Sequence, residues 1–402
     1  MRGNTIHSAP EALQHALASL TAGSKVGTQP LSHCKMACRI TLPFWPTSVD
    51  CLDWSNNNSL AVAGSESIAI LCPRLKGRGP NGTYWDTAVF EANAFTASEI
   101  PRRDPLSIDN FIIGEEVSTW QVSSLQWSSP GLSRYGGCAL AVLTSNRVLS
   151  MWDSEGRSEV ASNWKRKLVL NHVIRQHYRS DQTSAAESRG TMRNSEAEQV
   201  RQRVRSFAWL PISPNVLDKN AKPSSFNVHT QYLAVSTEGG DILILRIRSP
   251  YNLLKPDVKD WDCGVACTIR AGSAGDHGHS GFSVADSLTF SGARQSHQNQ
   301  GEVLSYVADG RLHHALLRFR MDDQKTQVSF EGFLRCEGEL GDTPILGPLR
   351  YFGSDRLISF GSDVAFCQSI SKASGTASVQ GRHTLDGRWD DISGAAVSSA
   401  LT

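Results

Sequence analysis

The sequence predicts an all-β fold, a WD-type β-propeller of five to seven blades. A Val-x-x-(Leu/Phe)-x-Trp motif occurs three times, and each copy is followed by a turn or loop and then Leu-Ala-Val. A further polar turn and another apolar run complete each unit. Repeated strand–turn–strand–turn–strand units are the sequence signature of a propeller. The motifs end at Trp54, Trp127 and Trp209, and the Leu-Ala-Val segments begin at Leu60, Leu140 and Leu233.

Local signals justify the strands and turns of these units in order. In the first motif Leu52 and Trp54 are two residues apart, so both side chains fall on one face of a strand. Turn residues fill 56–59 and 64–67, and Asp309-Gly310 between two apolar runs is a strong hairpin signal. The recognisable units cover residues 49–71, 117–152, 204–247, 284–319 and 349–370, the last two being weaker, and Trp389–Ile392 is a candidate start of a sixth.

The spacing of the motifs sets the domain boundaries. Successive motif tryptophans are 73 and 82 residues apart, whereas a regular WD-type blade needs about 40–45 residues. We therefore expect a mobile leader over 1–35 and one propeller over 36–402, with long insertions at 73–116 and 153–203. The first insertion could include an outer strand near Thr83–Phe90. The ring closes with a strand borrowed from Cys38–Leu42, or the sequence is incomplete at its C-terminal end.

Composition argues against several function classes. The formal net charge is +1 and 20% of residues are charged, so nothing attracts the whole chain to nucleic acid or to a membrane. No apolar stretch is long enough to span a bilayer. The nine cysteines are odd in number and scattered, which does not suit a disulfide framework. These features favour a reducing compartment, and we expect no metal site and no cofactor.

Several segments resemble one known family, the WD-repeat subunit of transcription factor IIIC with its delta-type N-terminal domain, in a fungal-like form. The resemblance lies in Leu52–Ser55 followed by Leu-Ala-Val-Ala, in Trp127–Trp152, and in the Arg-rich run into Val204–Trp209. It covers residues 40–250 well, and it covers the remainder only through the regular spacing of the expected strands. Trp-Ser and Leu-Ala-Val occur in many propellers, but their order and the insertion before the third unit favour this family.

The resemblance implies a non-enzymatic scaffold in RNA polymerase III transcription initiation. Its implied partners are the other transcription factor IIIC subunits, the initiation factor IIIB and components of RNA polymerase III. It implies a nuclear location, and contact with DNA only indirectly or weakly. Two alternatives remain open: a histone acetyltransferase, an activity proposed for the family, and a generic WD-repeat adaptor unrelated to transcription.

An acetyltransferase requires a loop that cradles acetyl-CoA. The pattern Arg/Gln-x-x-Gly-x-Gly/Ala occurs at Arg74–Gly79 and at Arg134–Ala139. In working enzymes this loop follows a strand and opens a helix, whose free N–H groups bind the pyrophosphate. Here a turn follows Gly79 and a strand is expected after Ala139, so ordinary glycine turns are the favoured interpretation.

Two sets of side chains are candidate functional residues. Trp54, Trp127 and Trp209 occupy the same place in each unit, so we interpret them as structural blade anchors that bury their indoles against a neighbouring blade. Residues 164–205 carry ten Lys and Arg against four acidic residues. This segment is either a charged contact patch for acidic partners or DNA phosphates, or a solvated linker and helix face. The residues proposed for the patch are Lys165, Arg166, Lys167, Arg201, Arg203 and Arg205.

Overall fold

In the residues that it describes, the computed structural model contains five β-sheets, each built on four consecutive antiparallel strands. The residues that it describes are 40–46, 48, 50–74, 85–96, 98–100, 120–186, 200–211, 230–251, 260–270, 285–291, 301–322, 325–337, 344–345, 348–352, 355–361 and 364–384.

Each of the first four sheets is built from four consecutive strands. Blade 1 contains β1 (Leu52–Trp54), β2 (Leu60–Ala63), β3 (Ser67–Pro73) and β4 (Trp85–Glu91), and blade 2 contains β5 (Val122–Trp127), β6 (Leu140–Thr144), β7 (Leu149–Ser154) and β8 (Trp164–Val169). Blade 3 contains β9 (Val204–Trp209), β10 (Thr230–Thr237), β11 (Asp241–Arg248) and β12 (Asp262–Arg270), and blade 4 contains β13 (Ala285–Phe290), β14 (Gly301–Ala308), β15 (Arg311–Asp322) and β16 (Lys325–Phe333).

Blade 5 has a fifth strand at its outer edge. Its antiparallel strands are β18 (Arg350–Phe352), β19 (Arg356–Phe360), β20 (Val364–Ser371) and β21 (Thr376–Thr384), and β17 (Arg335–Glu337) pairs with β21 in parallel. Because β17 follows β16 almost directly, the chain passes from blade 4 to the rim of blade 5. Only then does it run inward to β18.

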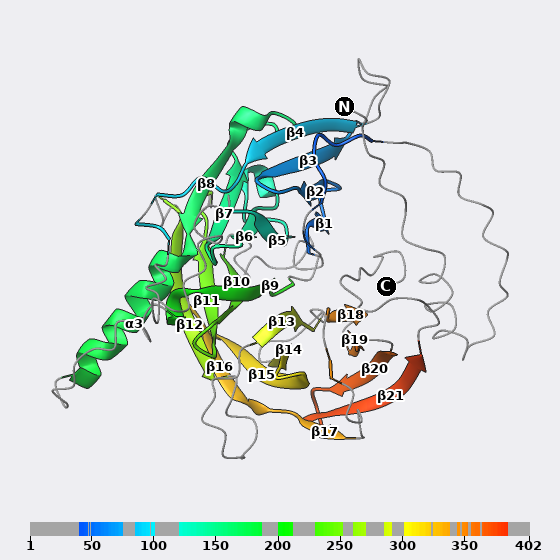
Figure 1. Cartoon of the computed structure of the whole chain (residues 1–402). Helices are drawn as coiled ribbons and strands as arrows, with labels where there is room; N and C mark the ends of the chain where they lie inside the picture. The colour runs from blue at the N-terminus through cyan, green and yellow to red at the C-terminus, as the bar shows by residue number, and fades with distance from the viewer. Residues whose placement is uncertain are drawn as a thin grey trace, which may run out of the picture.

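The five sheets are arranged radially around a common centre (Figure 1). The strands β1, β5, β9, β13 and β18 lie nearest that centre, and β4, β8, β12, β16 and, in blade 5, β17 lie outermost. This arrangement confirms the predicted all-β propeller. In the described part of the chain five blades are present, the lower end of the expected range.

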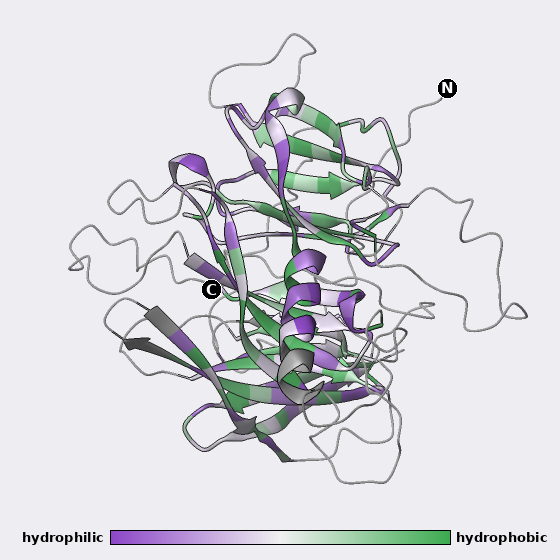
Figure 2. Cartoon of the chain, turned by 90° about the vertical axis from the view of Figure 1, so that its left-hand side faces the viewer, coloured by the Kyte–Doolittle hydropathy of each residue, from purple (hydrophilic) through white to green (hydrophobic). Residues whose placement is uncertain are grey.

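The blades pack through alternating faces of their strands. In β10 the side chains of Leu233 and Val235 enter the apolar core shared with blade 2, whereas Tyr232 and Ala234 enter the core shared with blade 4. Successive residues of a strand point to opposite sheet faces, so one strand serves two neighbours. Apolar stretches accordingly occur in many strands, beside hydrophilic ones (green and purple in Figure 2).

The motif tryptophans of blades 2 and 3 make equivalent contacts with the preceding blade. Trp127 and Trp209 are each 8% exposed. The indole Nε1–H of Trp127 donates to the backbone oxygen of Asp53 at 3.2 Å, and that of Trp209 donates to the backbone oxygen of Gln126 at 3.3 Å. Each acceptor is the residue just before the motif tryptophan of the preceding blade. The hydrogen bond is therefore repeated with the blades.

Trp54 departs from the expected burial against a neighbouring blade. It is 52% exposed, and its ring makes an edge contact with Trp85 at 5.9 Å between centroids. The motif face of blade 1 looks away from blade 2, because Ile68 and Ile70 fill the core shared with that blade. Trp54 stays exposed because no described blade precedes blade 1 in the chain to cover its indole.

Polar contacts tie the two ends of the described propeller together and reinforce the first interface. Arg350 of β18 pairs with Asp50, beside β1, at 3.5 Å. Asp53 accepts the backbone N–H of Trp127 at Oδ2 at 2.6 Å. Burial raises the pKa of the Asp53 carboxyl to about 6, although this hydrogen bond and the charge of Arg350 favour its ionised form.

The predicted turns and insertions have mixed outcomes. Asp309 and Gly310 both have positive φ, 51° and 70°, as the hairpin signal requires. The segments 73–116 and 153–203 are not simply insertions, because they contain the outer strands β4 and β8 of two blades. The leader 1–35 and the candidate sixth unit at 389–392 lie outside the described residues.

Replacing Trp127 by alanine is expected to lower the free energy of unfolding by about 3–5 kcal/mol, because a buried aromatic leaves the core between two blades. The matched change Trp54→Ala is expected to cost only about 1 kcal/mol, the order of one aromatic pair contact. Denaturant unfolding of both purified variants measures the difference. Equal destabilisation by the two changes would contradict the blade packing described above.

Candidate interaction surface

The cationic segment proposed from the sequence folds as a strand followed directly by a helix. β8 ends at Val169, and α3 (Leu170–Ala186) begins at the next residue. Leu170, Ile174 and Tyr178 are spaced four apart, so they form one helical stripe, and this stripe is buried in the core between blades 2 and 3. Outside this stripe, Asn171 is buried, whereas His172, Gln176, Arg179 and Ser180 are exposed. This part of the helix is mainly hydrophilic (Figure 2). Sequence reasoning missed this helix, although its four-residue apolar spacing was visible.

Two buried polar side chains fix α3 to the blades. Asn171 is fully buried: its Oδ1 accepts the N–H of Leu149 at 2.8 Å, and its Nδ2 donates to the backbone oxygens of Arg147 and Gln202 at 2.9 and 2.8 Å. The Tyr178 hydroxyl donates to Oδ2 of Asp241, at the start of β11, at 2.8 Å. Burial, together with the neighbouring Asp241 carboxylate, raises the pKa of Tyr178 well above its usual value.

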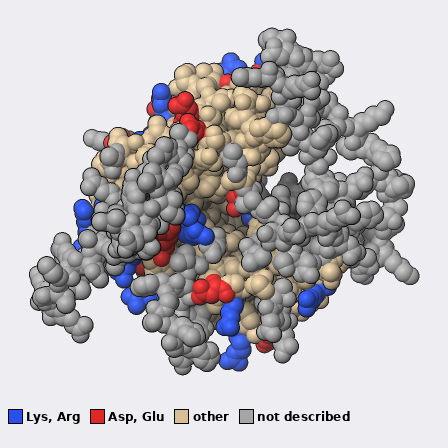
Figure 3. All heavy atoms as spheres, in the orientation of Figure 1, with Lys and Arg blue, Asp and Glu red and all other residues tan. Residues whose placement is uncertain are grey.

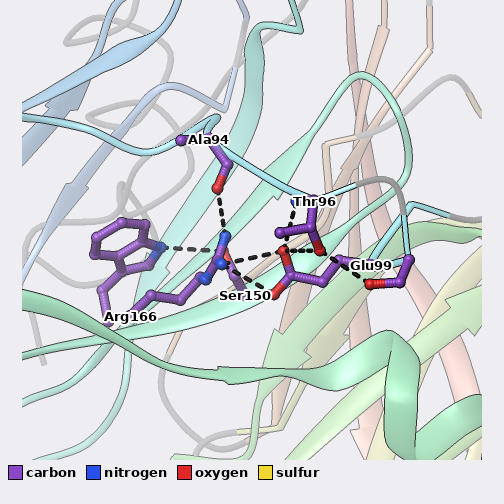
Figure 4. A network of polar contacts seen from close by, with 7 residues as sticks. Ala94, Thr96, Glu99, Ser150 and Arg166 are labelled. Carbon is purple, nitrogen blue, oxygen red and sulfur yellow. Dashed lines mark hydrogen bonds and ion pairs between the residues drawn. The ribbon is translucent and has the colours of Figure 1, made fainter.

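Arg166 is held in a polar network rather than presented to a partner. Its guanidinium donates to the backbone oxygen of Ala94 at 2.6 Å and to both carboxylate oxygens of Glu99 at 2.9 and 3.1 Å (Figure 4). Burial alone would raise the pKa of Glu99. Hydrogen bonds from the N–H and hydroxyl of Thr96 and the charge of Arg166 outweigh that effect, so the pKa lies below its ordinary value. This network clamps the segment after β4 onto β8.

Two more cations of the proposed patch have acidic partners in the chain. Lys167 donates to Glu155 at 2.5 Å. Arg203 and Arg147 bind the two carboxylate oxygens of Glu238 at 2.7 and 3.1 Å. Because Arg147 belongs to the β6–β7 turn and Glu238 to the β10–β11 turn, this triad joins blades 2 and 3. These cations therefore form ion pairs with other residues of the same chain.

The three remaining patch residues differ among themselves. Arg201 places its guanidinium 5.6 Å from the centroid of the Tyr178 ring, and its side chain packs over Gly239. Lys165 in β8 and Arg205 in β9 are exposed. On the face drawn in Figure 3, cationic groups lie beside acidic ones and do not gather in one basic area. On this face the surface therefore has mixed charge, with several cations paired to acidic groups. Such a surface is a poor match for extended contact with DNA phosphates.

The other motifs have ordinary structural contexts. Arg134 opens a 3₁₀ turn, and β6 begins at Leu140, so a strand and not a helix follows the glycine pattern. Gly77 and Gly79 lie outside the described residues. Among the described residues no group of three or more His, Cys, Asp or Glu could hold a metal ion. No described helix is long and apolar enough to cross a membrane.

A double-mutant cycle on Arg166 and Glu99 is expected to give a coupling free energy of about 1 kcal/mol, because their paired hydrogen bonds are mostly shielded from water. The cycle on Lys167 and Glu155 is the matched control. Its coupling is expected to be far weaker and to vanish in added salt, because Glu155 is exposed. Unfolding of the single and double alanine variants measures both. No coupling between Arg166 and Glu99 would refute the clamp.

Comparison with known proteins gives a family match and distant structural likeness. One similar chain belongs to a structure titled "Crystal Structure of Mitotic Checkpoint Complex", with 12% identity, 94% of each chain covered and a TM-score of 0.37. Another is the major Malassezia sympodialis allergen Mala s 1, with 12% identity, 83% of this chain and 77% of that chain covered, and a TM-score of 0.34. Such scores indicate only a remote likeness. No curated protein matches.

The family match covers most of the chain. Residues 54–402 match the family described as the transcription factor IIIC subunit delta beta-propeller domain. The match agrees with the five radial sheets and includes all of them except the first two residues of β1. The chain belongs to the transcription factor IIIC delta β-propeller family.

Proposed function

We propose that this chain is a scaffold subunit of transcription factor IIIC that makes protein–protein contacts during initiation by RNA polymerase III. The observation that carries the proposal is the family match over residues 54–402. On this proposal the chain acts in the nucleus and binds other subunits of the factor. It also contributes to contacts with the initiation factor IIIB and the polymerase.

The distribution of charge supports protein contact over direct DNA binding. Arg166, Lys167 and Arg203 are held by Glu99, Glu155 and Glu238. Cations that are already paired release fewer counterions from DNA, so they add little to affinity for its phosphates. The surface around α3 is rigidly fixed to two blades, which suits a platform whose shape is set before a partner binds.

Affinity capture from nuclear extract tests the proposal. The tagged chain is expected to retain other transcription factor IIIC subunits after nuclease treatment, because the contacts are between proteins. A variant with Lys165→Glu and Arg205→Glu is expected to keep these subunits. Identification of the captured proteins by mass spectrometry measures the outcome, with the destabilised Trp127→Ala chain as the folding control. Capture of no such subunit, or capture only while DNA is intact, would contradict the proposal.

A further inference from the structure

A polar pocket of about 250 Å³ lies where loops of blades 1 and 2 meet. It is formed by the β1–β2 turn, the β5–β6 connection and the β7–β8 connection. In antiparallel meanders these connections emerge on the same face of the propeller, because every second connection returns to the same end of the sheet. Its lining includes Ser55, Asn57, Ser133, Arg134, Tyr135 and Arg157, with Trp127 and Cys138 also contributing.

The side chains of this pocket suit an anion. Two guanidinium groups line it, together with serine hydroxyls and the Asn57 amide, and no Asp or Glu is among its lining residues. Arg134 donates through Nη1 to the backbone oxygen of Glu155 at 3.1 Å, which leaves its other N–H groups for a ligand. Arg157 pairs with Glu159 at 2.5 Å, but its side chain is 78% exposed. Only 25% of the Glu159 side chain is exposed, and Nε of Arg157 also donates to Glu159 at 2.7 Å, so an anion that binds Arg157 competes with this carboxylate.

The loop that carries Arg134 is rigid. The N–H of Gly131 donates to the backbone oxygens of Gly136 and Gly137, and the N–H of Ser133 also donates to Gly137, each at 3.0 Å. Below the loop, Ser133 donates its hydroxyl to the buried carboxylate of Asp153, which also accepts the hydroxyl of Tyr251 at 2.9 Å. A loop fixed in this way loses little conformational entropy when a ligand binds.

Tyr135 at the tip of this loop has no role in the core. It is 87% exposed and adopts the left-handed conformation, with φ 59° and ψ 27°. A bulky side chain in this conformation costs about 1–2 kcal/mol. The Arg134 guanidinium lies 5.4 Å from its ring centroid. Exposed Tyr and Arg side by side are the residue types most enriched at binding hot spots.

We propose that this pocket binds an anionic side chain, carried on an extended segment of a partner protein. Arg134 and Arg157 contact the anion, which is a phosphorylated serine or threonine or else a carboxylate, and Tyr135 packs on the adjoining peptide. The volume admits one side chain. A single exposed aromatic at the rim does not provide the successive stacking surfaces that single-stranded nucleic acid uses. The site does not depend on which assembly the chain enters.

Fluorescence polarisation with labelled peptide pools tests the proposal. The pools share random flanks and carry phosphoserine, glutamate or serine at the centre. Binding of the phosphoserine pool is expected to weaken about 10-fold in Arg134→Gln and in Arg157→Gln, the loss of about 1.4 kcal/mol of charge-assisted contact. The exposed Arg335→Gln in β17 is the matched control and is expected to bind normally.

A second variant separates binding from folding. Tyr135→Gly removes the ring, and glycine suits the left-handed backbone. This change is therefore expected to preserve the melting temperature and to weaken binding of the phosphoserine pool several-fold. Equal binding of the glutamate and phosphoserine pools supports the anionic site and assigns it to carboxylates. The proposal is overturned if the serine pool binds as tightly as the phosphoserine pool or if no pool binds. It is also overturned if neither arginine change alters binding of the phosphoserine pool. Tighter binding of a labelled oligothymidine with the same sensitivity to these changes overturns it as well.

Discussion

The interfaces between blades 1 and 2 and between blades 2 and 3 depend on one repeated contact, in which a motif tryptophan hydrogen-bonds the blade before it. Trp127 reaches the backbone oxygen of Asp53, and Trp209 reaches that of Gln126. The acceptor is displaced by one residue from the preceding tryptophan, so the same strand donates to one neighbour and accepts from the other. Each indole also removes a large apolar area from water. The contact thus fixes both the spacing and the register of adjacent sheets.

Much of this fold could be predicted because its signals are local. The motifs at 122–127 and 204–209 are the strands β5 and β9, and the Leu-Ala-Val segments lie in β2, β6 and β10. The outer strands β4 and β8 carry no motif, and of these two only β4 overlaps an expected strand, near Thr83–Phe90. The exposure of Trp54 could not be read from its motif either, since the motif is the same in all three units. Burial of an indole depends on whether another blade covers it.

Counting charges along the sequence does not show which of them are paired in the fold around α3. The sequence places Arg166 and Arg203 in a run of basic residues, but their acidic partners Glu99 and Glu238 come from distant parts of the chain. Only the fold brings these groups together: it ties Arg166 to the segment after β4 and makes Arg203 part of a triad between blades 2 and 3. The Arg134 loop is the opposite case, because the sequence predicts no ligand site there. Its glycine pattern is interpreted from the sequence as an ordinary turn, and the structure places it at the rim of a polar pocket.

Hydrogen exchange at the indole N–H groups tests the blade contact most directly. In a selectively labelled, folded chain, nuclear magnetic resonance can follow each of these protons separately. The indole protons of Trp127 and Trp209 are expected to exchange slowly, because each is buried and bonded to a carbonyl of the next sheet. That of Trp54 is expected to exchange fast, since its side chain is half exposed. Exchange at Trp127 and Trp209 as fast as at Trp54 would contradict the account.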